Sequence, residues 1–181
     1  MSDTSQAARC RAGCARHVIT PPIGTPLAGY FHDRFGTRVR DDLHAHAVVL
    51  EVGDTSLAIV SCDLIAPDAG ITEAVRGQIT DATGIEAQHI MICATHTHTG
   101  PAVVDKGTIG VDQDYLARLP GLIAATVLAA AGGRFTAELR PGRSQVQDLS
   151  FNRLFRLRDG SEVFGRRDTE VGNAGPIDPE L

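Results

Sequence analysis

The chain contains 181 residues, of which 43% are hydrophobic and 22% are charged, values typical of a globular protein. Its formal net charge of -5 and its lack of any run of basic residues argue against nucleic acid as a partner. No stretch approaches the ~20 apolar residues that cross a bilayer, so we expect no transmembrane segment. The polar N-terminus lacks the apolar run of a signal peptide, so we expect a cytoplasmic protein.

The first forty residues predict one strand and one long loop. Residues 1–12 are expected to form a disordered tail. The moderate alternation of residues 11–20 predicts a short strand, which Pro21 and Pro22 stop. Residues 23–40 are rich in Gly, Pro and Arg and predict a long loop, a kind of segment that is often functional.

A hairpin and then a strand–helix–strand unit are predicted next. Two β-forming runs, residues 45–51 and 56–62, flank the turn sequence Gly53-Asp54-Thr55. Asp68 can cap a helix that Gly84 ends. The apolar positions of this helix are Ile71, Val75, Ile79 and Ala82. The strand that follows runs toward residue 96, and this order predicts a βαβ unit with a parallel pair.

The second half of the chain predicts one more helix and several short strands. Residues 112–131 predict a helix that Pro120 kinks or splits in two. Its apolar positions are Leu116, Leu119, Ile123, Val127 and Leu128. Residues 135–147 predict a strand interrupted at Pro141, residues 154–157 and 162–164 predict a hairpin, and residues 166–181 are expected to be loop-like. The predicted fold class is α/β, with a mixed sheet, a βαβ unit and flanking helices.

The most informative motif is a pair of histidines one residue apart, His96 and His98, at the end of an apolar strand. In a strand, residues i and i+2 point to the same face, so both side chains are expected to project together. Open α/β sheets place ligand crevices beyond the carboxyl ends of their strands. Because imidazole is the commonest metal ligand and a proton carrier near neutral pH, the pair predicts a metal or catalytic site.

Further candidates lie around the neighbouring strands. A catalytic zinc ion usually takes three protein ligands, and the internal candidates to complete the set are Asp42, His44, His46 and Asp63. Asp63 can either orient a ligating histidine or cap its own loop, and the sequence leaves both readings open. We expect His44 and His46 to be solvated residues at a strand end. Cys62 and Cys93 are expected to be buried as small apolar side chains.

The histidine pair belongs to a longer pattern, Ala-Thr-His-Thr-His-Thr-Gly-Pro, at residues 94–101. Other segments accompany it in order: residues 16–24 with 28–30, 41–50, 60–64, 151–153 and 175–180. Together these segments resemble the neutral/alkaline, non-lysosomal ceramidases, over nearly the whole chain from Gly13 on. The histidine segment is the specific part of the resemblance.

Members of that family hydrolyse the amide bond of N-acylsphingosine at a zinc centre. The resemblance therefore implies Zn²⁺ as cofactor and a lipid amide, or a related amide or ester, as substrate. It implies that His96 ligates zinc and that His98 hydrogen-bonds the substrate in the site. Arg153, from an Asn-Arg element, would hold the polar head or the developing oxyanion. Zinc would polarise the carbonyl and activate water.

The family's other ligands (a histidine, a glutamate and a tyrosine) and its active-site serine have no counterpart within these 181 residues. We therefore expect residues 13–181 to be the N-terminal part of a larger ceramidase-like hydrolase domain that is inactive as this fragment. One alternative is a truncated, non-catalytic protein that binds metal weakly or serves in assembly, associating through an unfinished sheet edge. Another is a metal-independent lyase or esterase with His98 as its base.

Overall fold

The chain divides after Leu139 into two compact units, and each is described by itself. The computed structural model describes residues 8–30, 32–105, 110–146, 151–165 and 170–180. The larger unit contains the histidine motif, and the smaller unit contains Arg153.

A five-stranded mixed sheet forms the centre of the larger unit. Its strands are β1 (Ala8–Val18), β2 (His44–Val52), β3 (Thr55–Cys62), β4 (Ile90–Ala94) and β5 (Phe135–Leu139), in the spatial order β4-β3-β2-β1-β5. All neighbours are antiparallel except β3 and β4, which run parallel and are joined by helix α1 (Ala69–Thr83) and the 3₁₀ turn η1 (Ala87–His89). The predicted fold class, the hairpin and the βαβ unit are confirmed.

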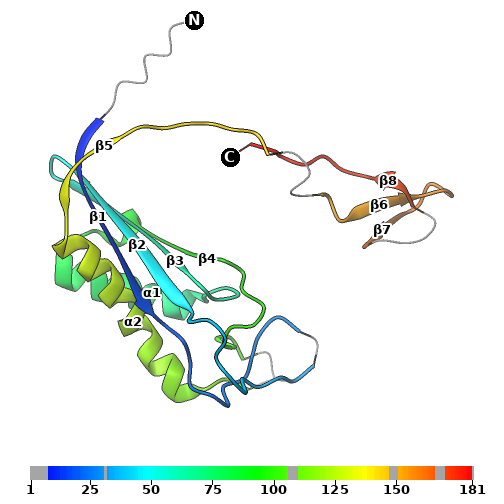
Figure 1. Cartoon of the computed structure of the whole chain (residues 1–181), viewed down its shortest axis with the longest axis horizontal. Helices are drawn as coiled ribbons and strands as arrows, with labels where there is room; N and C mark the ends of the chain where they lie inside the picture. The colour runs from blue at the N-terminus through cyan, green and yellow to red at the C-terminus, as the bar shows by residue number, and fades with distance from the viewer. Residues whose placement is uncertain (1–7, 31, 106–109, 147–150, 166–169, 181) are drawn as a thin grey trace, which may run out of the picture. The chain divides into compact units, whose positions relative to one another are not determined.

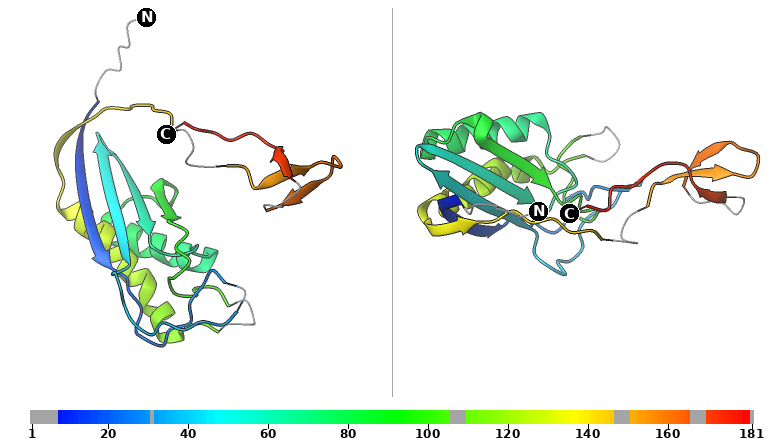
Figure 2. Two further views of the ribbon diagram at one scale, coloured as in Figure 1. Left: turned by 45° about the vertical axis from the view of Figure 1, so that its right-hand side comes forward. Right: turned by 90° about the horizontal axis from the view of Figure 1, so that it is seen from above.

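The two helices, α1 and α2 (Gln113–Gly132), cover one face of this sheet (Figures 1 and 2). Alternation along β2 shows which face is covered, because Ala45, Ala47 and Val49 are buried while His46 and Val48 are exposed. We call the other side, which carries His46 and Val48, the open face of the sheet. Both helices begin at aspartate caps: Asp68 accepts from the Ile71 amide and Asp112 from the Tyr115 amide.

Helix α2 departs from expectation at two points. It is continuous through Pro120 and is not split in two. A proline inside a helix costs about 3 kcal/mol, and the burial of Leu119 and Ile123 on either side of it offsets that cost. Leu128, predicted on the apolar side, is 37% exposed. At about 100° per residue it lies half a turn round the helix from Leu119, so this assignment was wrong.

By length and composition alone, α2 could cross a membrane. Its buried residues are Tyr115, Leu119, Ile123, Ala124, Thr126, Val127 and Ala130. All of these side chains except Thr126 join the hydrophobic core of the larger unit, an arrangement expected of a helix that packs on a sheet.

Two strand boundaries and the exposure of one helix residue differ from the sequence-based expectations. Strand β1 begins at Ala8, so residues 8–12, expected in the tail, pair with β5. Strand β5 ends at Leu139, and the rest of the predicted strand shows only an isolated bridge at Gln145, with residue 147 outside the described residues. Ala82 is exposed in the last turn of α1.

The smaller unit is a three-stranded antiparallel sheet in the order β7-β6-β8. Strands β6 (Leu154–Leu157) and β7 (Glu162–Phe164) form the predicted hairpin. Strand β8 (Glu170–Asn173) lies where a loop was expected. It contains one apolar residue and so lacks the alternation of apolar and polar residues that predicts a strand. Backbone pairing to β6 and hydrogen bonds of the Asn152 and Asn173 side chains hold it in place.

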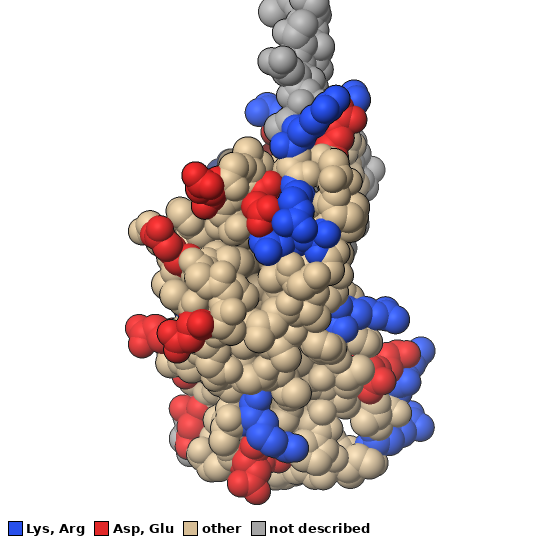
Figure 3. Space-filling model, turned by 90° about the vertical axis from the view of Figure 1, so that its left-hand side faces the viewer, with Lys and Arg blue, Asp and Glu red and all other residues tan. Residues whose placement is uncertain are grey.

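Charged side chains of both signs lie on one face of the molecule. On the face of the molecule drawn in Figure 3, acidic and basic groups lie around a broad uncharged area. This face therefore offers no continuous basic surface to a polyanion.

Candidate metal and catalytic site

The histidine motif lies in the loop that leaves β4. The strand ends at Ala94, two residues before His96, and the loop is anchored by hydrogen bonds from the Thr95 amide to Cys62 and from the Thr97 amide to Leu64. His96 has a φ of 61° and is the one non-glycine residue with positive φ among the described residues. Strand alternation therefore does not bring the two rings together, contrary to expectation. The left-handed backbone conformation of His96 brings the two rings together instead.

The two imidazole rings nevertheless lie side by side, with ring centroids 4.8 Å apart and planes at 71°. Nδ1 of His96 lies 2.9 Å from the carbonyl oxygen of Ile65, and Nδ1 of His98 lies 2.9 Å from that of Gly29. A carbonyl oxygen can only accept, so each Nδ1 carries a proton and donates it. In a neutral ring this leaves the Nε2 lone pair of both histidines available to a metal ion or a proton.

A loop from far earlier in the chain holds His98 in place. The guanidinium of Arg34 lies 3.5 Å from the ring centroid of Tyr30 and donates to the backbone carbonyl of His98 at 3.0 Å. The Tyr30 ring makes an edge contact with the His98 ring at a centroid distance of 6.3 Å. The amide of Ala28 donates to Gly100, which joins the two loops through their backbones. Nothing in the sequence local to Arg34 or Tyr30 points to the histidines, so their contacts with His98 were not expected.

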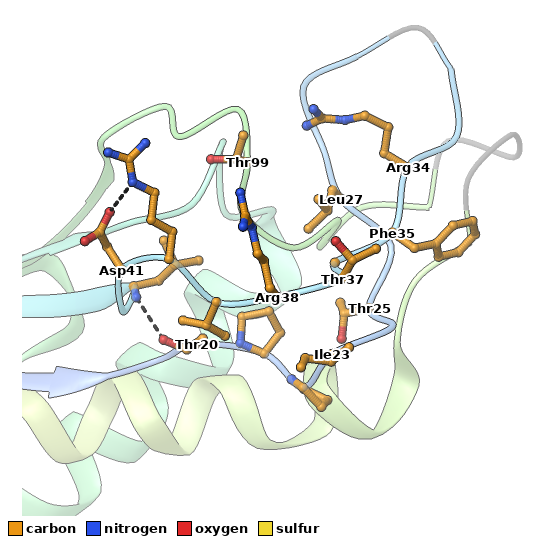
Figure 4. A pocket seen from close by; sticks show the side chains of 16 residues that line it. Thr20, Ile23, Thr25, Leu27, Arg34, Phe35, Thr37, Arg38, Asp41 and Thr99 are labelled. Atoms are coloured by element: carbon orange, nitrogen blue, oxygen red, sulfur yellow. Dashed lines mark hydrogen bonds and ion pairs between the residues drawn. The ribbon is translucent and has the colours of Figure 1, made fainter.

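A cavity of about 550 Å³ lies against the same loop (Figure 4). Its wall combines apolar side chains with three arginines: Ile23, Leu27, Phe35, Val39, Arg34, Arg38 and Arg40. Arg40 pairs with Asp41, whereas Arg38 extends toward Thr99, the residue next to His98, in Figure 4. The cavity wall is thus part apolar and part polar, and Thr99 is the residue of the histidine motif that lines it.

Asp63 closes the end of the sheet. One carboxylate oxygen of Asp63 accepts from the His44 amide at 2.9 Å, and the other accepts from the Thr95 hydroxyl at 3.1 Å. The Thr95 hydroxyl also lies 2.7 Å from the Thr97 hydroxyl. Asp63 thus ties the start of β2 to the loop that carries His96. The His96 Nδ1–H donates to the Ile65 carbonyl, so the hydrogen bonds of Asp63 cap the loop, and its orienting of a metal-bound histidine stays a prediction.

Three other residues considered in the sequence are one arginine and two cysteines. Arg153 lies in the smaller unit with an exposed side chain, and its backbone carbonyl accepts from the Gly165 amide. Cys62 is fully buried as expected, and burial raises the pKa of its thiol to about 12. Cys93 is only half-buried, and its thiol lies 3.4 Å from the Val60 carbonyl.

The side chains of His44 and His46 lie close to Asp63 where β2 begins and β3 ends. Ligand atoms of His44, His46 and Asp63 all lie within 4.8 Å of one another. His44 and His46 were expected to be solvated at a strand end, and His46 is indeed exposed. Their proximity to Asp63 follows from the antiparallel register of β2 with β3, where Ala45 lies opposite Cys62.

The sequence matches no protein-family model and no curated protein. The fold does match solved structures. Neutral ceramidase from Pseudomonas aeruginosa aligns with 83% of this chain and 25% of its own, at a TM-score of 0.66 and 19% identity. A ceramidase complexed with C2 aligns with 80% of this chain and 24% of its own, at a TM-score of 0.67 and 20% identity.

The chain therefore has an α/β fold similar to part of the neutral ceramidases. It spans about a quarter of the length of the structures it matches. The expected resemblance is confirmed at the level of the fold.

Proposed function

We propose that this chain contributes part of the active site of a zinc-dependent amide hydrolase that acts on a ceramide-like lipid amide and releases a fatty acid and an amine. The observation that carries the proposal is the pair of Nε2 atoms on His96 and His98, which have no partner among the described residues, while an Nδ1 bond to a carbonyl fixes each ring. The fold shared with neutral ceramidases supports it.

The donor set of the histidine pair fits a zinc ion. Imidazole whose Nδ1–H is held by a carbonyl presents Nε2 as a ligand in a fixed orientation, and the exposed ring of His96 leaves room for ligands from elsewhere. His96 would hold the ion, which when bound supplies a Lewis acid that polarises an amide carbonyl and lowers the pKa of water.

His98 would act on the substrate directly. Its Nε2 can accept a hydrogen bond or a proton, and the Nδ1–H bond to Gly29 holds the ring in place. Arg153 would bind the polar head or the developing oxyanion, since a guanidinium donates two hydrogen bonds in one plane. The cavity that Thr99 lines, with its apolar and arginine side chains, suits an amphipathic lipid amide.

The test uses the native polypeptide that contains this sequence, purified from its source. We expect one bound zinc ion that depends on His96, and release of fatty acid from N-acylsphingosine. His96→Ala should remove that ion and the hydrolysis together. His98→Ala should retain zinc and lose turnover. Undiminished zinc content and turnover in His96→Ala would overturn the proposal.

The open face of the sheet favours a second candidate, a role in assembly. Val48, Leu57, Ile59 and Met91 lie on this face with exposed fractions of 38%, 38%, 36% and 55%. A contiguous apolar sheet surface promotes association. Size-exclusion chromatography of the chain decides this candidate: a dimer or larger species supports it, and a stable monomer of 19.2 kDa argues against it.

A further inference from the structure

The cluster of His44, His46 and Asp63 does not include the proposed zinc ligand His96, and the proposed hydrolysis gives it no role. His44 and His46 are alternate residues of β2 and point to the open face, away from the helices. Their ring centroids are 5.6 Å apart, and Asp63 follows the last residue of the neighbouring strand β3. Three potential ligands therefore converge from two adjacent strands of a rigid sheet.

The ligand atoms of this cluster retain lone pairs that a cation can use. In the part of the chain that the structure describes, neither the His44 nor the His46 ring makes a hydrogen bond or an ion pair. The Asp63 oxygens accept one hydrogen bond each, and every carboxylate oxygen has a second lone pair. Those bonds hold the carboxylate in a fixed orientation, as hydrogen-bonded carboxylate ligands are held in metal sites.

The spacing also suits a small cation. Ligands about 2.1 Å from a tetrahedral ion lie about 3.4 Å from one another, and these ligand atoms lie within 4.8 Å. Closing the difference takes a modest rotation of side chains, and His46, which is exposed, can rotate without displacing a neighbour in the core.

We propose that His44, His46 and Asp63 form a second metal site, one that takes a divalent first-row transition-metal ion such as Zn²⁺ and leaves coordination positions open. Two imidazoles and one carboxylate are a ligand set that selects such ions over Mg²⁺ and Ca²⁺, which prefer oxygen ligands. Three protein ligands leave positions for water or another molecule. The proposal does not depend on the proposed hydrolase function.

Asp63 gives this site a connection to the histidine motif. The oxygen that would complete the metal site belongs to the same carboxylate that accepts from Thr95, next to His96. Binding a cation to Asp63 weakens the carboxylate as an acceptor for the Thr95 hydroxyl. The two sites are therefore expected to influence each other, although each has its own ligands.

The experiment is a calorimetric titration of the 181-residue chain with Zn²⁺ alone at pH 7, repeated with Mg²⁺. We expect Zn²⁺ binding and no heat with Mg²⁺. His46→Ala and Asp63→Asn should each weaken the binding at least about tenfold. His17→Ala is the matched control, because His17 is an exposed histidine of β1 in the same sheet but outside the cluster. His96→Ala should leave this binding event in place.

A second readout uses the unmodified chain, so it does not depend on how variants fold. Imidazole nitrogen resonances of His44 and His46 should shift on adding Zn²⁺, and those of His17 should not. Unchanged affinity in both His46→Ala and Asp63→Asn would overturn the proposal. Shifts confined to His96 and His98 would also overturn it and would leave the proposed hydrolase site standing.

Discussion

The carbonyl oxygen of Gly29 lies 2.9 Å from Nδ1 of His98, and the same glycine packs against the His98 ring and backbone. A Cβ on residue 29 would lie 2.7 Å from Cγ and 2.8 Å from Cα of His98. Gly29 also has a φ of 94°, a conformation that side chains rarely adopt. A residue 69 positions earlier in the chain therefore fixes both the tautomer and the place of the second histidine.

Gly29→Ala should displace His98. The new methyl meets backbone as well as ring atoms, so the loop itself must shift. Gly24→Ala is the matched control, because Gly24 has a φ of 93° and nothing within 4 Å of the added carbon. Both variants carry the backbone strain of about 1 to 3 kcal/mol, and only Gly29→Ala adds the contact. We expect a larger fall in the melting temperature and a larger His98 chemical shift change for Gly29→Ala. Equal effects in the two variants would contradict this.

The sheet and helices were predictable because their signals are local. The caps at Asp68 and Asp112, the turn at Gly53 and the periodicity of Ile71, Val75 and Ile79 each lie within one element. Errors came where tertiary packing decides. Burial on the sheet keeps α2 whole through Pro120, and backbone pairing to β6 makes a strand of residues 170–173.

The candidate site was predictable only in part. The histidine pair has a sequence signature, but the partners that orient it, the carbonyls of Ile65 and Gly29, are backbone groups without one. Arg34 and Tyr30 reach His98 because two loops that are distant in the sequence fold together, and no local sequence pattern predicts that contact. Strand register likewise decides that His44 and His46 meet Asp63.

The cysteines should differ sharply in reactivity. Burial, with smaller contributions from Cys93 and Asp63, raises the pKa of the Cys62 thiol to about 12. Because the thiolate is the reactive form, Cys62 should resist alkylation at pH 8 in the folded protein. Cys14, which is exposed, should be alkylated first. Mass spectrometry after iodoacetamide treatment measures this, and labelling of Cys62 as fast as Cys14 would show that the sheet opens readily.

Helix α2 should act as a core helix. Ile123 is fully buried, so Ile123→Ala should lower the free energy of unfolding by about 2 to 5 kcal/mol. Leu122 on the same helix is 36% exposed, and Leu122→Ala should cost much less. Denaturant unfolding of both variants provides the measurement. Similar losses would mean that the two faces of α2 are equally covered in solution.

Arg153 should affect turnover and not metal content. If it binds the substrate head or the oxyanion, Arg153→Ala should lower the turnover of the native polypeptide and leave its zinc content unchanged. Asn152→Ala is the contrasting variant, because the Asn152 side chain bonds the backbone at Leu154 and Pro176 and so holds the smaller unit together. That variant should lower stability. Equal loss of zinc and turnover in Arg153→Ala would assign Arg153 a structural role.

Asp112 should make the stability of the larger unit depend on pH. Hydrogen bonds from the Tyr115 amide and the Thr25 hydroxyl lower the pKa of Asp112 below its ordinary value of 3.8. A carboxyl whose pKa is lower in the folded state binds protons more readily when unfolded. Its stabilisation is therefore fully present above the ordinary pKa and is lost as the pH falls through the folded pKa.

Asp112→Asn tests this because an amide can still cap the helix but does not titrate in this range. The difference in unfolding free energy between the parent and Asp112→Asn should be largest near neutral pH and should shrink as the pH falls below 3.8. Thr25→Val, which removes one of the two main donors, should raise the pKa of Asp112 when the carboxyl is titrated by NMR. A parent–variant difference that stays constant with pH would mean that Asp112 stabilises the helix by capping geometry alone.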